Sequence, residues 1–380
     1  MIETQVFSPP ASGRSVVADM DIIPANLQMN NVQAVFAALP TQAIREYYEC
    51  KVPPTAPTGL IESHFKGVAA SGDKLIFTHT DLDPIFPALH GKYLIGDVIS
   101  TGDQGQIDRT YDTAHTGWCH PCGAQACGSF MAMGIQESAS GRGADASQIQ
   151  IYDIRNAQHD QPIAPIGTIP RPNDGINGVA MTKEDGDDGK YIVAGVNGSS
   201  LTIYRSTCSS LLSGGPMDFQ AIFHTDGFSA SGAGLALITQ VGGDIYMVSM
   251  NANDDGSNSE IALYQLYLKA TPYACVPVPG AVKNMPIPGM SESITLLETY
   301  LATIPPPWGK FLAGLLELGS GLLNSSFRWG KGLSITSPDT IEIYATDRNV
   351  LPISHIPQIN SKKDFSLVVW ASARPEHSVP

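Results

Sequence analysis

The stretch GLALITQVGGDIYMVSM, residues 234–250, decides the fold. It starts with a glycine and a run of small and apolar residues, turns at Gly242-Gly243, and continues as a second strand-like segment. A third segment with alternating apolar side chains, EIALYQLYL, follows at residues 260–268. Short apolar runs separated by glycine and aspartate turns are typical of half-buried antiparallel strands. The stretch therefore predicts one small unit of consecutive strands.

The same unit recurs at four other places in the chain. Its other copies are GVAASGDKLIFTHT from Gly67, GAQACGSFMAMGIQ from Gly123, GVAMTKEDGDDGKYIVAGVN from Gly178 and GLSITSPDTIEIYATD from Gly332. The openings at residues 67, 123, 178 and 234 lie 56, 55 and 56 residues apart. A fixed period of this length, filled with short strands, is typical of β-propeller blades. We therefore expect an all-β propeller.

The number of blades depends on the segment between Gly234 and Gly332, which are 98 residues apart. This segment has room for a sixth blade or for an insertion. Residues 291–326 favour an insertion, because Leu and Ile recur there at helical spacing on both sides of Pro305-Pro306-Pro307. We expect a five-bladed β-propeller with a helical insertion before the last blade, and a six-bladed propeller is the alternative. The apolar insertion could serve as a lid or as a homo-oligomer interface.

The N-terminal residues 1–60 are expected to complete the propeller of residues 61–380. After FSLVVWASA, at 365–373, the last blade has too few residues for a fourth strand. Either ETQVF, at 3–7, or SVVADMDII, at 15–23, is expected to supply that closing strand. Residues 27–50 are predicted to be helical, interrupted at Pro40, and to cap one face of the ring.

The composition excludes several classes of partner. The net charge is −14 and the chain has no basic run, which argues against a nucleic-acid partner, because phosphate binding requires clustered Lys and Arg. No window approaches the roughly 18 uninterrupted apolar residues that a membrane span requires. The first 30 residues lack the basic start and apolar run of a signal peptide.

Six cysteines and two glycosylation sequons, Asn197-Gly-Ser and Asn324-Ser-Ser, favour a mature glycoprotein of the secretory pathway with disulfides. A cytoplasmic protein is the alternative. Three of the cysteines lie in GWCHPCGAQACG, residues 117–128. A zinc site would need a second pair of ligands, and the sequence contains none at a suitable spacing. A thioredoxin-like site would need Cys119 at the start of a helix, whereas this segment leads into a strand. We therefore expect ordinary strand residues here, with Cys119 and Cys122 either bonded or free.

The residues at and just before each innermost strand are expected to line the central channel. These segments are Ser63-His64-Phe65-Lys66, Cys119-His120-Pro121-Cys122, Gly175-Ile176-Asn177, Ser231-Gly232-Ala233 and Arg328-Trp329-Gly330-Lys331. The predicted lining is cationic, amide and aromatic, without a carboxylate, which disfavours a metal-dependent hydrolase. The acidic residues 184–189 are interpreted as a solvated turn rather than a calcium site. No cofactor motif occurs, so neither a cofactor nor a metal is expected.

Three segments of this pattern resemble a known family. HPCGAQACGSFMAMGIQES from His120, the strand SQIQIYDIR from Ser147 and DGINGVAMTK from Asp174 are similar to a group of fungal β-propeller proteins. This group includes the hetero-Diels–Alderases of tropolonic sesquiterpene biosynthesis. The resemblance covers most of residues 60–373, and no catalytic residue of the family can be matched one for one.

The resemblance implies a cofactor-free pericyclase with small hydrophobic polyketide and terpene substrates. A hydroxylated tropolone would lose water, and the resulting quinone methide would add across an alkene of a humulene-type sesquiterpene. Catalysis would need donors near the tropolone oxygens, and the candidates are Lys66, His120, Asn177 and Lys331. The residues expected to contact the substrates are His64, Trp118, Phe228, Arg328 and Trp329.

Each of these residues also has a purely structural interpretation. The polar side chains could bond to the backbone at strand ends, the lysines could point to solvent, and Phe228 and Trp329 could be core residues. The competing function is a non-catalytic ligand- or sugar-binding propeller. A sugar-binding propeller would repeat its site in every blade, whereas the matched positions here differ between units, which favours one asymmetric central site.

Overall fold

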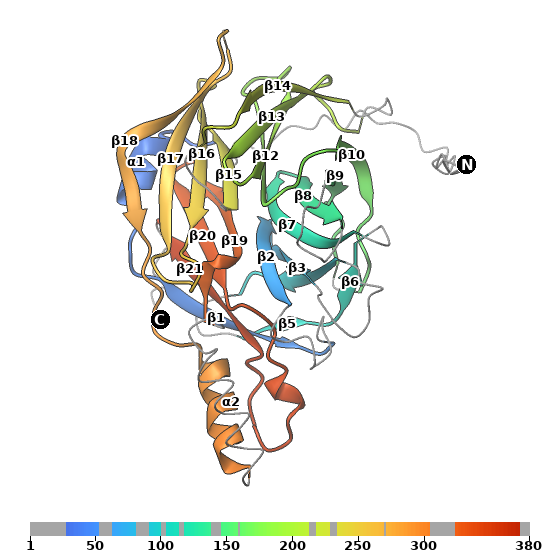
Figure 1. Ribbon diagram of the computed structural model, residues 1–380, viewed down its shortest axis with the longest axis vertical. Helices are drawn as coiled ribbons and strands as arrows, with labels where there is room; N and C mark the ends of the chain where they lie inside the picture. Colours follow the sequence, from blue (N-terminus) through green and yellow to red (C-terminus); the bar gives the residue numbers. More distant parts are fainter. Residues whose placement is uncertain are drawn as a thin grey trace, which may run out of the picture.

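The computed structural model describes residues 28–52, 63–80, 91–99, 104–113, 118–137, 146–158, 160–212, 218–228, 234–269, 271–304 and 324–372. Regular structure in these ranges is mostly β-strand (Figure 1). The helical segments described are α1 (Val32–Ala38), α2 (Glu292–Thr303) and the short 3-10 segment η3 (Ile353–His355). The predicted all-β class is confirmed. None of the described helices has the length and hydropathy of a membrane-spanning segment.

Three sheets have four antiparallel strands each, paired in chain order. The first contains β7 (Trp118–Cys127), β8 (Phe130–Glu137), β9 (Ser147–Asp153) and β10 (Pro165–Arg171). The second contains β11 (Gly178–Lys183), β12 (Tyr191–Asn197), β13 (Ser200–Ser206) and β14 (Phe219–Thr225). The third contains β15 (Gly234–Thr239), β16 (Ile245–Asn251), β17 (Glu260–Tyr267) and β18 (Ala274–Asn284).

A nine-stranded sheet contains the first and last repeats of the sequence. Its order is β5 (Gln104–Ile107), β1 (Ile44–Cys50), β21 (Phe365–Ala371), β20 (Thr340–Thr346), β19 (Ser326–Ser337), β2 (His64–Ser71), β3 (Lys74–Thr80), β4 (Lys92–Asp97) and β6 (Thr110–Asp112). Its two halves are joined by a single parallel pair, Lys331 with Gly67. Each half therefore contains a four-stranded group like those of the other sheets. This layout is compatible with five four-stranded units around one axis (Figure 1).

The first strands of these groups contact one another in a ring, in the order β2, β7, β11, β15, β19 and back to β2. The glycines that define the sequence repeat lie on these strands, and several of them lie where two backbones meet. A Cβ atom on Gly67 would lie 2.6 Å from the backbone nitrogen of Ala124, and one on Gly332 would lie 1.8 Å from the carbonyl oxygen of Val68. Glycine permits this close approach because it has no side chain.

Gln125 joins three of the inner strands through its side-chain amide. Its Nε2 donates to the carbonyl oxygen of Leu237 at 2.9 Å, and its Oε1 accepts from the backbone N–H groups of Met181 and Leu237 at 3.0 and 2.7 Å. The side chain is buried. These bonds link β7, β11 and β15 and satisfy both ends of a buried amide, which would otherwise be destabilising.

β21 pairs with β20 on one side and with β1 on the other. The β1–β21 register runs from Ile44–Val369 to Tyr48–Phe365. The prediction of helix over residues 27–50 is therefore wrong for its second half and correct for α1. Glu46, Tyr48 and Cys50 alternate as buried residues along β1, which is the period of a strand. Side-chain contacts with β21 outweigh local helix propensity here. ETQVF and SVVADMDII lie outside the described residues.

The cysteines and sequons do not support the predicted disulfides and glycosylation. Cys50, Cys122, Cys127, Cys208 and Cys275 are free thiols, and the side chain of Cys119 lies outside the described part. The Nδ2 atom of Asn197 donates to Asp174, and that of Asn324 donates to the carbonyl oxygen of Gly289. Both amide nitrogens are engaged in the fold. The secretory localisation stays a prediction without support from these features.

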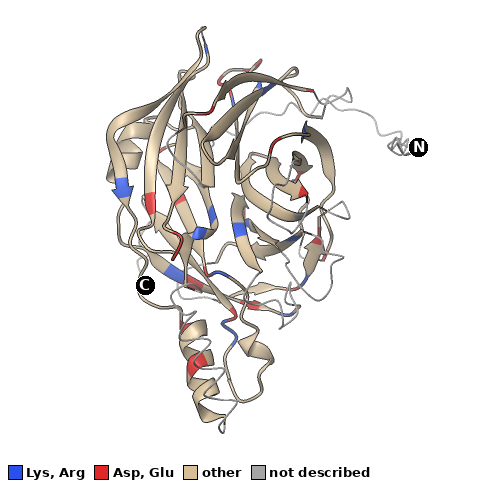
Figure 2. Cartoon of the chain, viewed as in Figure 1, with Lys and Arg blue, Asp and Glu red and all other residues tan. Residues whose placement is uncertain are grey.

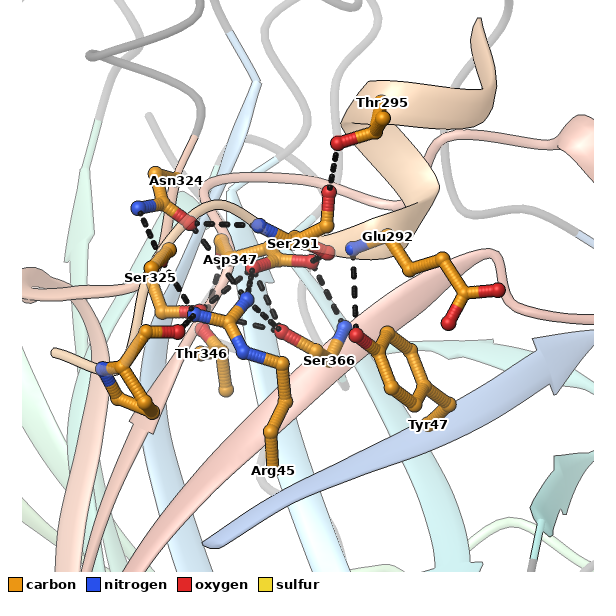
Figure 3. Close-up of polar contacts among 12 residues, drawn as sticks. Arg45, Tyr47, Ser291, Glu292, Thr295, Asn324, Ser325, Thr346, Asp347 and Ser366 are labelled. Atoms are coloured by element: carbon orange, nitrogen blue, oxygen red, sulfur yellow. Dashed lines mark hydrogen bonds and ion pairs between the residues drawn. The ribbon is translucent and has the colours of Figure 1, made fainter. Parts of the chain in front are cut away.

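The insertion begins with α2 immediately after Ser291, as the sequence predicts, and residues 305–323 lie outside the described part. Figure 3 shows the buried polar cluster that holds both ends of the insertion on the sheet. Asp347, at the end of β20, accepts hydrogen bonds from the hydroxyls of Ser291, Ser325 and Ser366 at 2.8, 2.6 and 2.8 Å. Arg45 on β1 lies 3.6 Å from Asp347.

Arg45 also contacts the two ends of the insertion directly. Its guanidinium donates to the carbonyl oxygens of Pro288 and Gly289 and to Oδ1 of Asn324. Burial raises the pKa of the Asp347 carboxyl, and Arg45 and the serine hydroxyls oppose that shift. The closing strand, the last blade and the insertion therefore share one charge pair (Figure 3).

Gly332→Ala is expected to lower the free energy of unfolding by roughly 2–4 kcal/mol, because the new methyl group would overlap the backbone of β2. Urea denaturation followed by intrinsic fluorescence measures this change. Gly227→Ala is the matched control, since its Cβ would meet only Thr225 Oγ1 at 3.9 Å. The control is expected to change stability by less than about 0.5 kcal/mol. Equal effects of the two variants would contradict a close-packed glycine ring.

Asp347→Ala is expected to lower the free energy of unfolding by about 3–5 kcal/mol, because it leaves the buried Arg45 guanidinium without its carboxylate. Asp108→Ala, which removes an exposed pair with Lys51, should cost less than about 1 kcal/mol. Urea denaturation compares the two variants. Limited proteolysis should also cut the Asp347 variant faster within residues 288–326. Unchanged cleavage would show that this cluster does not hold the insertion.

Candidate functional site

Basic residues lie on the neighbouring inner strands β2 and β19 (Figure 2). Lys66 lies on β2, Arg328 and Lys331 lie on β19, and Arg348 follows β20. Lys66 and Lys331 each precede a glycine of the repeat. Because Lys331 pairs with Gly67, the two lysines differ by one position in register. The predicted candidates Lys66, Lys331 and Arg328 are therefore brought together.

Lys331 is the most enclosed member of this group, with 6% of its surface exposed. Its aliphatic stem lies across Gly234 of β15, where an added Cβ would be 2.5 Å from the lysine Cγ. Lys66 is half-buried. Within the part of the chain that the structure describes, neither amine has a hydrogen bond or ion-pair partner. The Nη1 atom of Arg328 pairs with the exposed Asp254 at 2.5 Å.

Burial and neighbouring positive charges destabilise the charged forms of both lysines. Burial lowers the pKa of Lys331 to about 7, and the charges of Lys66 and Arg328 add to this effect. Burial, together with Arg328 and Arg348, also lowers the pKa of Lys66. The pKa of His120 falls well below its usual value because the ring is buried and close to Lys66. At neutral pH the site thus contains a neutral imidazole and a lysine that can donate or accept a proton.

Aromatic rings lie beside the two arginines of this group. The guanidinium carbons of Arg348 and Arg328 lie 4.6 and 5.1 Å from the ring centre of Trp329. His64 lies edge-on to Trp329 at 5.6 Å and to His120 at 5.8 Å. The indole N–H of Trp329 is buried and has no acceptor among the described residues. Trp329 therefore lies together with the two arginines and His64.

Cys122 lies beside the two lysines but is a neutral thiol. Its Sγ donates to the carbonyl oxygen of Ile176 at 2.7 Å, and burial raises its pKa to about 12. The surrounding Cys-x-x-Cys segment lies on β7, so its first cysteine is not at a helix start. Within the described ranges, no group of three His, Cys, Asp or Glu side chains could hold a metal ion.

Two predicted residues have structural contacts elsewhere. The Asn177 side-chain oxygen accepts from the backbone N–H of Gly198 at 2.9 Å, which stabilises the turn between β12 and β13. Phe228 is buried in a core between the second and third sheets and packs on Tyr264 at 5.1 Å. Trp118 is partly buried at the start of β7, where its carbonyl oxygen accepts from the N–H of Gly91. No contact in the described ranges joins Asn177 or Phe228 to the lysines.

Arg348 is the residue that the sequence analysis missed. It lies in the segment after β20, outside the aligned strand openings, and its carbonyl oxygen accepts from the N–H of Phe65 at 2.8 Å. The neighbouring Asn349 donates to the carbonyl oxygen of Ser63 and bonds to His79. His79 is buried in this contact. The repeat gave no signal for Arg348 because the corresponding segments of other units differ.

The acidic residues 184–189 line a surface cavity of about 970 Å³ that lies apart from the cations. Glu184 pairs with Arg205 at 2.8 Å, and Asp185 accepts from Gln28 and from the N–H of Gly242. Their carboxylates are used in structural contacts, as expected for a turn. Glycosidases require two convergent carboxyl groups, and no described residue supplies such a pair beside Lys66 and Lys331.

No protein-family model and no curated protein match the chain. Among solved structures, similarity is found to an exo-β-1,3-galactanase from Phanerochaete chrysosporium, with 9% identity, a TM-score of 0.39, and coverage of 87% of this chain and 64% of that one. The chain therefore spans less than two thirds of the galactanase's length. An α-L-arabinofuranosidase from Podospora anserina has 10% identity, a TM-score of 0.42, and coverage of 88% of this chain and 98% of its own. These values assign the chain neither a family nor an activity.

Lys331→Met is expected to stabilise the protein most below about pH 7, by roughly 3–5 kcal/mol. Between pH 7 and the higher pKa that Lys331 has in the unfolded chain, the Lys331 amine is protonated in the unfolded state but not in the folded state. Wild-type stability therefore rises with pH, and the advantage of the variant shrinks. Urea denaturation at several pH values measures the difference, with the exposed Lys362→Met as control. A difference independent of pH would contradict the burial of a titrating Lys331.

Proposed function

We propose that the protein is a five-bladed β-propeller that acts as a cofactor-free pericyclase. The proposed reaction is the hetero-Diels–Alder addition of a tropolone-derived quinone methide to a humulene-type sesquiterpene, with the preceding loss of water. The single observation that carries the proposal is the pair of lysines, Lys66 and Lys331, which have no carboxylate partner among the described residues and lie in one group with Arg328, whose guanidinium lies over Trp329. Such a site suits oxygen-rich conjugated substrates rather than hydrolysis.

The first step requires proton transfer at two oxygens of the tropolone. The ammonium form of Lys331 donates a proton to the departing hydroxyl group, which leaves as water. The tropolone hydroxyl loses its proton to a neutral base, either the amine of Lys66 or the imidazole of His120. The chain supports this division, because the pKa of His120 lies well below its usual value and that of Lys331 is about 7.

The second step forms one C–C and one C–O bond between the quinone methide and the alkene. It needs no external acid, and the protein contributes by holding the two reactants at bonding distance. Donors that remain near the carbonyl oxygen lower the energy of the acceptor component. Trp329 and His64 supply flat surfaces for the ring, and Trp118 lies on the neighbouring β7. Phe228 is not part of this wall, because it packs in the core.

A non-catalytic ligand-binding propeller is the second candidate. A surface cavity of about 690 Å³ is lined by neutral polar residues including Ser257, Asn258 and Asn284. The adjacent Asp254 pairs with Arg328 of the cationic group. A hydroxylated ligand could bind there without any chemical change, since hydroxyl and amide side chains both donate and accept hydrogen bonds.

The test is incubation of the metal-stripped protein with a hydroxymethyl tropolone and humulenol, followed by mass spectrometry and chiral chromatography of the products. We expect faster formation of one stereoisomer than in a protein-free control. Lys331→Ala should reduce this rate by at least about 100-fold, the usual contribution of a general acid. Lys362→Ala, on the surface, is the matched control and should retain the rate. Product ratios and rates equal to those without protein would favour the binding propeller instead.

A further inference from the structure

Among the described residues, the two lysines of the cationic group have no carboxylate partner. Four basic side chains, Lys66, Arg328, Lys331 and Arg348, influence one another, and Asp254 is the carboxylate that pairs with one of them. Buried charges without partners are costly, and proteins retain them where a ligand completes the pairing. The chain as a whole carries a net charge of −14, so the cluster contrasts with the rest of the protein.

We infer that this group is an oxyanion receptor, and that the conjugated substrate binds as a planar monoanion with its oxygen atoms between the amines of Lys66 and Lys331. The indole N–H of Trp329 supplies a further donor to the same anion. The identity of the conjugated ligand rests on the proposed function, whereas the anion site rests on the charges alone.

The arrangement of donors fits a flat anion with few oxygens. Both guanidinium groups lie over the ring of Trp329, and Arg328 is already paired with Asp254. The groups left for the ligand are two ammonium point charges and the buried N–H of Trp329. These can serve one or two oxygens of an enolate or tropolonate, whereas a phosphate presents more oxygens and favours bidentate arginine contacts. The edge-on rings of His64 and His120 lie beside such a flat ligand.

Binding of an anion should be coupled to proton uptake. The groups that act on Lys331 are Lys66 from β2, Cys122 from β7 and Arg328 from its own strand. Arg348 after β20 and His120 on β7 interact with the neighbouring Lys66. Lys66, Arg328 and burial together hold the pKa of Lys331 near 7, and Cys122 acts in the opposite direction. An adjacent negative charge favours the ammonium form and raises that pKa. Above about pH 7, the complex would therefore take up a proton that the free protein lacks.

Isothermal titration calorimetry of the full chain tests this inference with tropolone and its O-methyl ether, in chelator-treated buffer at about pH 8. We expect tropolone to bind at least tenfold more tightly than the ether. Repeating the titration in two buffers of different ionisation enthalpy measures the proton uptake. Lys331→Met should abolish the uptake and weaken binding at least tenfold, and Lys66→Met should weaken binding to a similar extent. Lys362→Met is the control, since its exposed amine pairs with Glu49.

The outcomes separate this inference from the proposed function. Equal affinity for tropolone and its ether, or unchanged binding in both lysine variants, would overturn the oxyanion receptor. Tighter binding of inorganic phosphate than of tropolone would overturn the planar monoanion. Tropolone binding with proton uptake, but without product formation in the mass-spectrometric assay, would support the receptor and refute the pericyclase. Accelerated cycloaddition of the hydroxymethyl tropolone, together with equal affinity for tropolone and its ether, would keep the enzyme and remove the receptor.

Discussion

The close approach of the inner strands is the constraint on which the rest of the structure depends. Backbone atoms of neighbouring strands meet at Gly67 and Gly332, where no side chain would fit. This contact brings the first strands into a ring, and Gln125 ties three of them together through its amide. The outer strands then stack away from the ring, and cores of apolar side chains fill the spaces between sheets.

The close approach of the inner strands also brings positively charged side chains together. Lys66 and Lys331 directly precede two of the ring glycines, so the approach of β2 and β19 brings both amines to one place. Burial and neighbouring positive charges lower the pKa of both lysines, which favours proton transfer and anion binding at neutral pH. The ring therefore creates the candidate site as a direct consequence of strand packing.

The last blade is completed by strand pairing and by a buried charge pair. β1 pairs with β21 and is the fourth strand of the last blade. The Arg45–Asp347 pair connects β1 to both ends of the insertion (Figure 3). A buried charge pair is a weak source of stability but is sensitive to the loss of either partner. The position of the insertion thus depends on the correct docking of the N-terminal strand.

The sequence by itself determined the all-β class, the repeat and the inner-strand positions, because glycine spacing and apolar alternation are local properties. It also placed Lys66, Arg328, Trp329 and Lys331 in one site, since they adjoin the repeat. Only the tertiary structure decided that residues 44–50 form the closing strand, that Asn177 stabilises a turn and Phe228 a core, and that Arg348 joins the cations. These outcomes depend on contacts between residues far apart in the chain, which no local pattern encodes.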